Sequence, residues 1–168
     1  MGKAIAIFNQ KVGVGKTTTN INLAACLAIK GKKVLILDID PQGNTTSGVG
    51  ISKRDLEVTT HEILIEDDYH PEEAVIPTGI ENLDIMPASV QLAGAEVELI
   101  ELTGIEKRLK RAIDVLRPKY DYIFVDCPPS LGILTINSLT AVDSVLIPIQ
   151  CEFYALEGLS QLTNTIRQ

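Results

Sequence analysis

A short segment near the N-terminus carries residue types that bind phosphate groups. Gly13, Gly15, Lys16 and Thr17 stand in the order Gly-x-Gly-Lys-Thr, between an apolar run and a segment with helical periodicity. Backbone N–H groups beside glycine can approach an anion closely, and the start of a helix adds partial positive charge. The lysine would bridge outer phosphates, and the threonine hydroxyl would ligate Mg²⁺. The alternative is a glycine-rich turn without a ligand, which the strand–loop–helix setting disfavours.

Two acidic segments supply carboxylates that could complete such a site. Asp40 lies in the segment 38–44, Asp126 opens the segment 126–130, and each segment follows an apolar run. Ligands of open α/β sheets bind beyond the carboxyl ends of strands, where both segments emerge. We therefore expect Asp126 to hold Mg²⁺ or its waters near Thr17, and Asp40 to orient an attacking water. Taken alone, each aspartate could equally be a turn residue or a helix cap.

The elements that must position these residues begin with short apolar runs. Continuous β-branched runs without polar alternation are typical of strands that are buried on both faces, as in parallel sheets. The runs of this kind, the last of them a weaker candidate, are Ala4–Phe8, Val34–Leu37, Tyr122–Val125, Val145–Ile149 and Leu83–Met86.

Segments with helical features lie between these runs. Thr17–Ile29 is the first, and a capping-box spacing from Thr59 to Glu62 starts another. Gly104–Leu116 places its apolar residues on one face before Pro118 stops it. Strands that alternate with helices predict an α/β fold, a mostly parallel twisted sheet with helices on both faces.

The composition fits one globular domain. The chain has 168 residues, 45% of them apolar, and a domain typically takes roughly 150 residues. We therefore predict a single domain over residues 1–168. Asp and Glu number 22 against 15 Lys and Arg, which gives a net charge of −7 and argues against a basic surface over the whole chain.

No targeting or membrane segment is recognisable in the sequence. The longest apolar run, Leu23–Ile29, is far shorter than the ~18 residues of a membrane span, and the N-terminus lacks the apolar core of a signal peptide. The chain has 3 cysteines and no Cys-x-x-Cys pair, which excludes a disulfide scaffold and disfavours a zinc site. These features predict a cytoplasmic protein with no membrane partner.

Several reactive residue types have no partner motif. We expect Cys127 and Cys151 to be small strand-end residues, and His61 and His70 to lie at the surface or in helix caps.

A basic run, Lys107–Arg111, continues with Arg117 and Lys119. It could contact phosphates of a nucleic acid. Acidic residues close by in sequence favour a solvated helix face instead.

The glycine-rich loop resembles the deviant Walker A motif of ParA/MinD-type ATPases, Lys-Gly-Gly-x-Gly-Lys-Ser/Thr. Lys11 matches the extra lysine of that motif, and Val12 stands where the motif has its first glycine. The chain is similar to ParA/Soj-type chromosome- and plasmid-partition ATPases from Gly2 to Gln168. The stretches that carry the similarity are Phe8–Asn22, Leu35–Gly48, Tyr120–Leu139 and Ser144–Leu162.

The resemblance implies a P-loop ATPase with ATP and Mg²⁺ as cofactors. It gives catalytic roles to Asp40 and to Lys11, which reaches the partner's phosphates across a nucleotide-sandwich dimer. It implies that the metal ion is held by Thr17, Asp40 and Asp126. It assigns the nucleotide contacts to Lys11, Val12, Gly13, Val14, Gly15, Lys16, Thr17 and Thr18.

The resemblance also implies a biological setting. Family members form ATP-dependent homodimers that bind DNA without sequence preference, and a ParB/Spo0J-type centromere-binding partner stimulates their weak ATPase activity. This implies a cytoplasmic, nucleoid-associated protein. The chain ends inside a helix that opens near residues 156–158, so we expect it to be the N-terminal portion of a longer domain. Its DNA binding should then be weak.

Val12 is the departure from the family pattern. If its position uses a positive φ, a β-branched residue is strained there. Its side chain also lies beside the lysine that must reach the partner. We therefore expect Val12 to spare ATP binding but to hinder the dimer and hydrolysis, leaving a monomer. The alternative is that Val12 points into solvent and changes nothing.

The same motifs also occur in proteins with other functions, which are the alternatives to a partition ATPase. A MinD-type membrane-cycling ATPase needs a C-terminal amphipathic helix, which this chain cannot show. An iron–sulfur carrier needs paired cysteines. A nucleotide-binding switch without turnover needs only the phosphate loop, and it stays open as an alternative.

Overall fold

The computed structural model describes residues 2–100, 104–151 and 163. Within this part of the chain, one six-stranded sheet runs through the molecule in the order β3-β4-β2-β5-β1-β6. All neighbours pair in parallel except β3 and β4. The strands are β1 Lys3–Ile7, β2 Val34–Asp38, β3 Ile76–Pro77, β4 Leu83–Met86, β5 Tyr122–Asp126 and β6 Ser144–Leu146.

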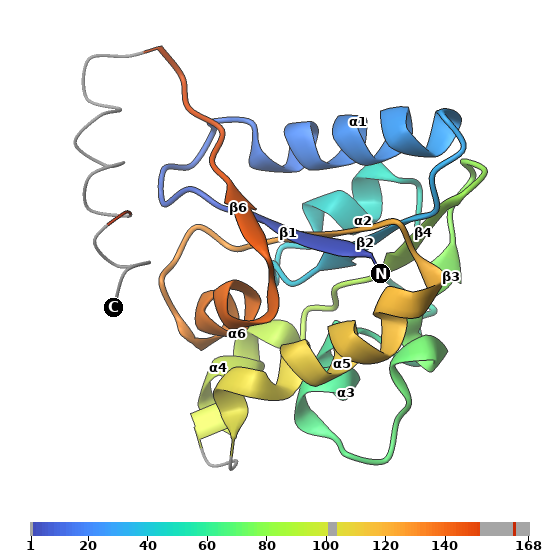
Figure 1. Ribbon diagram of the computed structural model, residues 1–168. Coiled ribbons are helices and arrows are strands. Elements are labelled where there is room, and N and C mark those ends of the chain that lie inside the picture. The colour runs from blue at the N-terminus through green and yellow to red at the C-terminus, as the bar shows by residue number, and fades with distance from the viewer. Residues whose placement is uncertain (1, 101–103, 152–162, 164–168) are drawn as a thin grey trace.

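Helices cover both faces of this sheet (Figure 1). The α-helices are α1 Lys16–Ile29, α2 Asn44–Gly48, α3 Thr60–Ile65, α4 Leu92–Ile100, α5 Arg108–Leu116 and α6 Ile133–Ala141. Three short 3₁₀ segments accompany them in the described residues: η1 Pro71–Ala74, η2 Ile105–Lys107 and η3 Arg117–Lys119.

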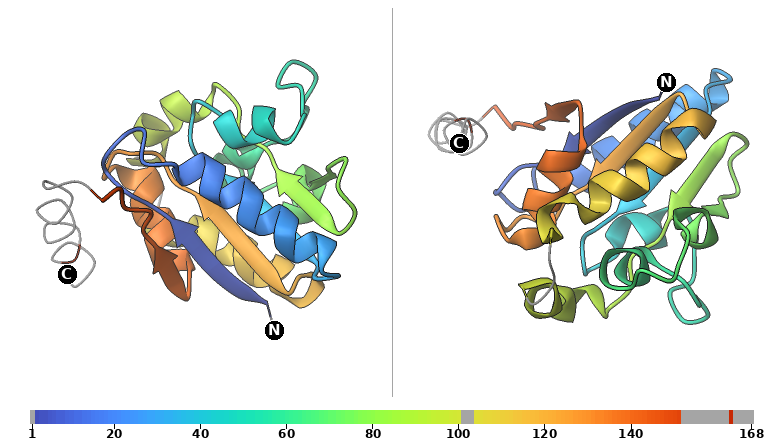
Figure 2. Two further views of the ribbon diagram at one scale, coloured as in Figure 1. Left: turned by 90° about the horizontal axis from the view of Figure 1, so that it is seen from above. Right: turned by 60° about the horizontal axis from the view of Figure 1, so that its bottom comes forward.

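The core has two layers because successive side chains of a strand point to opposite faces. On β2, Leu35 and Leu37 pack toward α3, α4, α5 and α6, whereas Val34 and Ile36 pack toward α1. Figure 2 shows α1 lying across one face and α5 across the other. Both faces of the central strands are therefore buried, which explains their continuous apolar runs.

The register of the central strands aligns their carboxyl ends. Ile7 of β1 and Asp38 of β2 both pair with Asp126 of β5. The segments that follow these strands therefore emerge at one level of the sheet, which we call the carboxyl edge.

The predicted α/β class is confirmed, with differences in its elements. The predicted strand Val145–Ile149 is wrong over most of its length, because β6 ends at Leu146. Pro148 has no N–H to offer to a strand ladder. The helix predicted over Gly104–Leu116 divides into η2 and α5. The helix predicted near residues 156–158 lies outside the described residues.

The prediction of a solvated basic face is wrong for two arginines. Arg108 is buried, and it donates to the carbonyl oxygens of Leu64 and Ile65, both at 3.1 Å. Arg117 is buried as well and pairs with Asp143 at 2.8 Å. An arginine can bury its apolar stem when its guanidinium finds carbonyl or carboxylate partners.

The cysteines and histidines occupy unremarkable positions. Cys127 is buried directly after β5, and this burial raises the pKa of its thiol to about 12, so the thiol stays protonated. Cys151 is exposed. His70 precedes η1 as its N-cap residue, and Nδ1 of His61 lies 3.0 Å from Glu62.

No helix in the described part of the chain combines the length and the apolar character that crossing a membrane requires.

Candidate functional site

The glycine-rich loop connects β1 to α1 at the carboxyl edge. Gly13 has a φ of 80° and Gly15 a φ of 87°, in the left-handed region that favours glycine. A Cβ at Gly13 would meet nothing within 4 Å, so the backbone angle, not space, requires glycine there. Gly15 is the N-cap residue of α1, and its carbonyl accepts the N–H of Thr19 at 2.8 Å. The two glycines thus turn the loop into the helix.

Two valines in the loop have opposite environments. Val14 is buried, which anchors the loop on the core. Val12 is 75% exposed, and its φ is not positive. The expectation of backbone strain at Val12 is therefore not met, because the positive angles fall on the neighbouring glycines.

Lys16 and Lys11 lie on this loop. The ammonium of Lys16 donates to the carbonyl oxygen of Lys11 at 3.2 Å. The backbone N–H of Lys11 donates to Oδ1 of Asn9 at 2.9 Å, and the Lys11 side chain is exposed. The Lys16 ammonium therefore lies over the loop, beside the positive end of α1.

Asp126 joins two hydroxyl groups at the end of β5. Its Oδ2 accepts from Thr17 at 3.0 Å and from Thr45 at 2.5 Å. Its Oδ1 is buried and has no hydrogen-bond partner among the described residues. Burial raises the pKa of Asp126, although the bonds from Thr45 and Thr17 oppose this rise.

Asp38 and Asp40 flank the end of β2 and differ in their surroundings. Asp38 is fully buried and accepts both the N–H and the hydroxyl of Thr46, at 2.8 and 2.6 Å. Burial, together with the nearby charge of Asp126, raises the pKa of Asp38 to about 7. Asp40 is half-buried, and its Oδ1 accepts the N–H of Gln42 at 2.9 Å. Asp40 is thus the aspartate of this segment that reaches the surface.

A cavity of about 290 Å³ opens between the loop and the Asp40 segment. Among the predicted site residues, Val14 is buried beneath the loop, while Lys11 and Asp126 are not part of the cavity wall. Asp126 reaches the wall through its bond to Thr17. The lining residues, most of them predicted from the sequence, are Val12, Gly13, Gly15, Lys16, Thr17, Thr18, Asp40, Gln42, Asn44 and Pro129.

The sequence analysis missed residues that hold the loop in place. Nδ2 of Asn9 donates to the carbonyl of Pro148 at 2.8 Å, and Nε2 of Gln150 donates to the carbonyl of Gly13 at 3.2 Å. These bonds tie the loop to the segment after β6. Their positions in the sequence could have indicated this role, because Asn9 and Gln150 each follow a strand that ends at the carboxyl edge. Thr45, Thr46 and Asp38 were also missed.

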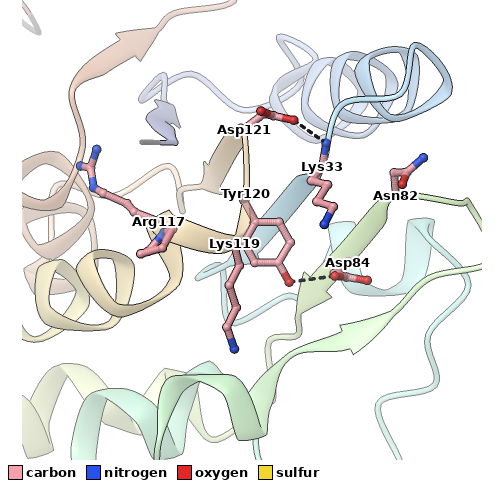
Figure 3. Close-up of a pocket in the computed structure, with 8 residues that line it drawn as sticks. Lys33, Asn82, Asp84, Arg117, Lys119, Tyr120 and Asp121 are labelled. Carbon is pink, nitrogen blue, oxygen red and sulfur yellow. Dashed lines mark hydrogen bonds between the residues drawn. The ribbon is translucent and has the colours of Figure 1, made fainter.

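A second, larger cavity of about 600 Å³ lies at the opposite, amino edge of the sheet (Figure 3). The hydroxyl of Tyr120 donates to Asp84 at 2.8 Å, and the backbone N–H of Lys33 donates to Asp121 at 2.8 Å. These polar groups join the segments that lead into β2, β4 and β5. The glycine-rich loop and the aspartate segments lie at the other edge.

A protein-family model described as an AAA domain matches residues 2–168. The sporulation initiation inhibitor protein Soj of Bacillus subtilis is 62% identical over 167 residues, which cover 99% of this chain and 66% of that protein. The chromosome partitioning protein ParA of Myxococcus xanthus is 54% identical, over 99% of this chain and 58% of that protein. The chain therefore spans less than two thirds of the length of these relatives.

Solved structures share the fold closely. A crystal structure named cobyrinic acid a,c-diamide synthase from Mycobacterium smegmatis, with bound ATP analogue and magnesium, superposes with a TM-score of 0.93 and 42% identity, over 99% of this chain and 68% of that one. A plasmid partition protein from Borrelia burgdorferi bound to AMPPNP gives a TM-score of 0.87 and 32% identity, over 99% of this chain and 69% of that one.

Proposed function

The chain belongs to the ParA/Soj family of partition ATPases, and we propose that it is the catalytic portion of an ATPase that acts in chromosome or plasmid segregation. The observation that carries this proposal is the meeting of Lys16, Thr17 and Asp40 around one cavity, with Asp126 directly behind Thr17. We also propose that the whole chain, residues 1–168, is one P-loop domain.

The residues of the site fit Mg-ATP. Gly13 and Gly15 leave the loop backbone bare of side chains, and no acidic residue occupies the first turn of α1. The buried Oδ1 of Asp126, which has no hydrogen-bond partner in the described part of the chain, offers an acceptor for a metal-bound water. Within the described residues, no three His, Cys, Asp or Glu side chains form a metal-binding group. Mg²⁺ at nucleotide sites is typically held by one or two protein groups together with phosphate oxygens and water.

Each side chain has a separate task in the proposed site. Loop N–H groups and Lys16 would hold the phosphates, and Thr17 would hold the metal. Asp126 accepts the proton of the Thr17 hydroxyl at 3.0 Å, and this bond uses neither of the two lone pairs that could bind a metal. Asp40 would orient the attacking water and stand near the metal. ATP would supply the transferable phosphoryl group, and Mg²⁺ would supply positive charge that neutralises the phosphate oxygens.

Lys11 and Val12 bear on the proposed dimer. Both are exposed at the loop, where a second subunit carrying the same loop would approach. We propose that Lys11 acts on the nucleotide of the partner, as in the family. Val12 would place an apolar side chain at that approach and weaken both the dimer and hydrolysis, leaving mostly monomer.

The proposed partners are DNA, bound without sequence preference, and a ParB/Spo0J-type protein that stimulates turnover. The acidic balance of −7 supports only weak DNA binding by this chain. A cytoplasmic, nucleoid-associated location follows from these partners.

Two substitutions test the proposed function. Lys16→Ala should weaken Mg-ATP binding, measured by calorimetry, about 10- to 100-fold, because a hydrogen bond to a charged group contributes about 1.5–3 kcal/mol. Lys32→Ala, in the exposed turn that follows α1, is the matched control and should bind normally. Asp40→Ala should keep binding and lose phosphate release, since a water-orienting group acts in the transition state.

Two results would contradict the proposal. If the Lys16→Ala variant bound Mg-ATP as tightly as the unmodified chain, the loop could not be the phosphate-binding loop that we propose. Binding without any phosphate release, in the unmodified chain with DNA and a ParB-type partner present, would favour a switch without turnover.

A further inference from the structure

Thr45 joins the two halves of the site at its base. It is fully buried in the first turn of α2, and its hydroxyl donates to Oδ2 of Asp126 at 2.5 Å. The same carboxylate oxygen accepts the hydroxyl of Thr17 at 3.0 Å. One oxygen atom therefore holds the start of α1 and the start of α2.

The Asp40 segment and α2 form one continuous unit. The N–H of Gly43 donates to the carbonyl of Asp40 at 2.8 Å, and the N–H of Gln42 donates to its carboxylate at 2.9 Å. Asp38 holds both ends of this unit, since it accepts the N–H of Asp40 at 3.3 Å and that of Thr46 at 2.8 Å. A displacement of Thr45 therefore displaces the backbone that carries Asp40.

We propose that Thr45 is a positioning residue, which couples the Asp40 segment to Thr17 through their shared bond to Asp126. This inference rests on the proposed function, because Thr17 and Asp40 matter only if the site binds and cleaves ATP. A hydroxyl has one proton and two lone pairs. Thr17 can therefore keep its bond to Asp126 while its oxygen faces a metal ion.

The geometry requires a hydroxyl at this position. Asp126 in its ionised form only accepts hydrogen bonds, so its Oδ2 draws both threonine hydroxyls toward one point. Without the Thr45 hydroxyl, α2 loses its side-chain link to Asp126, while the bonds of the Asp40 segment to Asp38 and to Lys53 remain and do not connect it to Thr17. Removing a group that hydrogen-bonds to a metal ligand and orients it typically lowers metal affinity or activity by about 10- to 100-fold.

Thr45→Val tests the inference, because valine has the same shape and lacks the hydroxyl. Phosphate release at saturating ATP should fall about 10- to 100-fold, with a much smaller change in KM for ATP. Thr45→Ser keeps the hydroxyl and should restore the rate. Thr78→Val is the matched control, because its hydroxyl donates to the carbonyl of Leu83 at 2.7 Å in the turn before β4.

A second readout follows the Asp40 segment without turnover. The ammonium of Lys53 donates to the carbonyl of Gln42 at 2.7 Å, so trypsin cleavage after Lys53 reports on that segment. Mass spectrometry follows the rate of this cleavage. Mg-ATP should slow the cleavage of the unmodified chain and of the Thr45→Ser and Thr78→Val variants. In the Thr45→Val variant, Mg-ATP should leave the cleavage rate unchanged, although calorimetry should still show that ATP binds.

The outcomes separate this inference from the proposed function. An unmodified chain that does not bind Mg-ATP refutes the proposed function. An unmodified chain that binds and hydrolyses ATP, with Thr45→Val within about twofold of it in rate and protection, refutes the role of Thr45. Circular dichroism checks folding, and Thr45→Ala replaces the valine variant if that one does not fold. Loss of folding in both would make Thr45 a structural residue and overturn the inference.

Discussion

At the scale of single residues, Val12 presents an apolar side chain at the rim of the phosphate loop. It is 75% exposed and lines the cavity with Gly13 and Gly15. Because its backbone carries no positive φ, a glycine at this position would relieve no strain within the monomer. The proposed effect of Val12 on dimer formation would therefore arise from its exposed side chain and not from its backbone.

Val12→Gly should accordingly leave the affinity for Mg-ATP unchanged and increase dimer formation. The measurement is light scattering with ATP, carried out in an Asp40→Ala background that prevents turnover. Val97→Gly removes an exposed valine on α4 and serves as a control for loss of apolar surface. A chain with Val12 that already dimerises as well as the glycine form would show that Val12 simply points into solvent.

At the scale of elements, Arg108 connects α5 to the end of α3. Its guanidinium donates to the carbonyls of Leu64 and Ile65, which lie in the last turn of α3 and have no further helical N–H to accept. The side chain is only 8% exposed, so water cannot replace it freely.

Arg108→Met should lower the free energy of unfolding by about 1.5–3 kcal/mol, the usual contribution of hydrogen bonds from a charged donor. Arg111→Met, an exposed arginine on the same helix, is the control and should change it by less than about 0.5 kcal/mol. Urea unfolding measures both. Arg108 does not line the 290 Å³ cavity, so ATP binding should persist in both variants. Equal stabilities would mean that Arg108 only fills space.

Elements with one dominant sequence pattern were predictable, and others were not. The central strands are buried on both faces, so their apolar runs are unbroken, and α1 begins at a glycine–lysine signal. Helix α6 was missed because buried polar residues interrupt its apolar pattern. The side chains of Asn137 and Ser138 donate hydrogen bonds to the carbonyl oxygens of Ile133 and Leu134, one turn earlier in the helix.

The candidate site divides in the same way. The phosphate loop is local in sequence, so its spacing alone indicates phosphate binding. The bond between Thr45 and Asp126 joins residues that are 81 positions apart, and only the strand register brings them together. No spacing rule identifies such a pair, because a threonine near a strand end is common in turns and caps.

At the scale of the whole molecule, the two edges of the sheet have different roles. The carboxyl edge holds the candidate site, whereas polar groups at the amino edge bond to one another (Figure 3). There the hydroxyl of Tyr120 donates to Asp84, and burial, together with this bond, raises the pKa of Tyr120 above its ordinary value of 10.0.

Stability should therefore fall at alkaline pH through Tyr120. Because its pKa is higher in the folded chain than in the unfolded one, the folded state retains the proton above pH 10, where the unfolded state loses it. This contribution is complete below about pH 10 and is lost as pH rises further. Urea unfolding between pH 7 and 11.5, roughly spanning that value, should show a shallower alkaline loss for Tyr120→Phe. Tyr122→Phe is the control, and a Tyr120→Phe curve parallel to the unmodified one would contradict the assignment.

The distribution of charge over the molecule limits the DNA binding that we propose. The net charge is −7, and two of the arginines that a sequence count includes, Arg108 and Arg117, are buried in bonds to carbonyls and carboxylates. On α5 and the turn before it, Lys107 and Arg111 remain exposed. Each phosphate contact contributes about −0.9 to the slope of log affinity against log salt. Two such contacts give a slope of about −2, so binding to random duplex DNA should be weak and lost at modest salt.

Fluorescence anisotropy from 20 to 200 mM salt, roughly the range over which phosphate contacts are lost, measures that slope. Replacing Lys107 and Arg111 together by Gln should bring it close to zero, while Lys32→Gln serves as the exposed control. Tight binding near physiological salt, with a slope of about −5 or steeper, would mean that many more cations contact the DNA than α5 exposes.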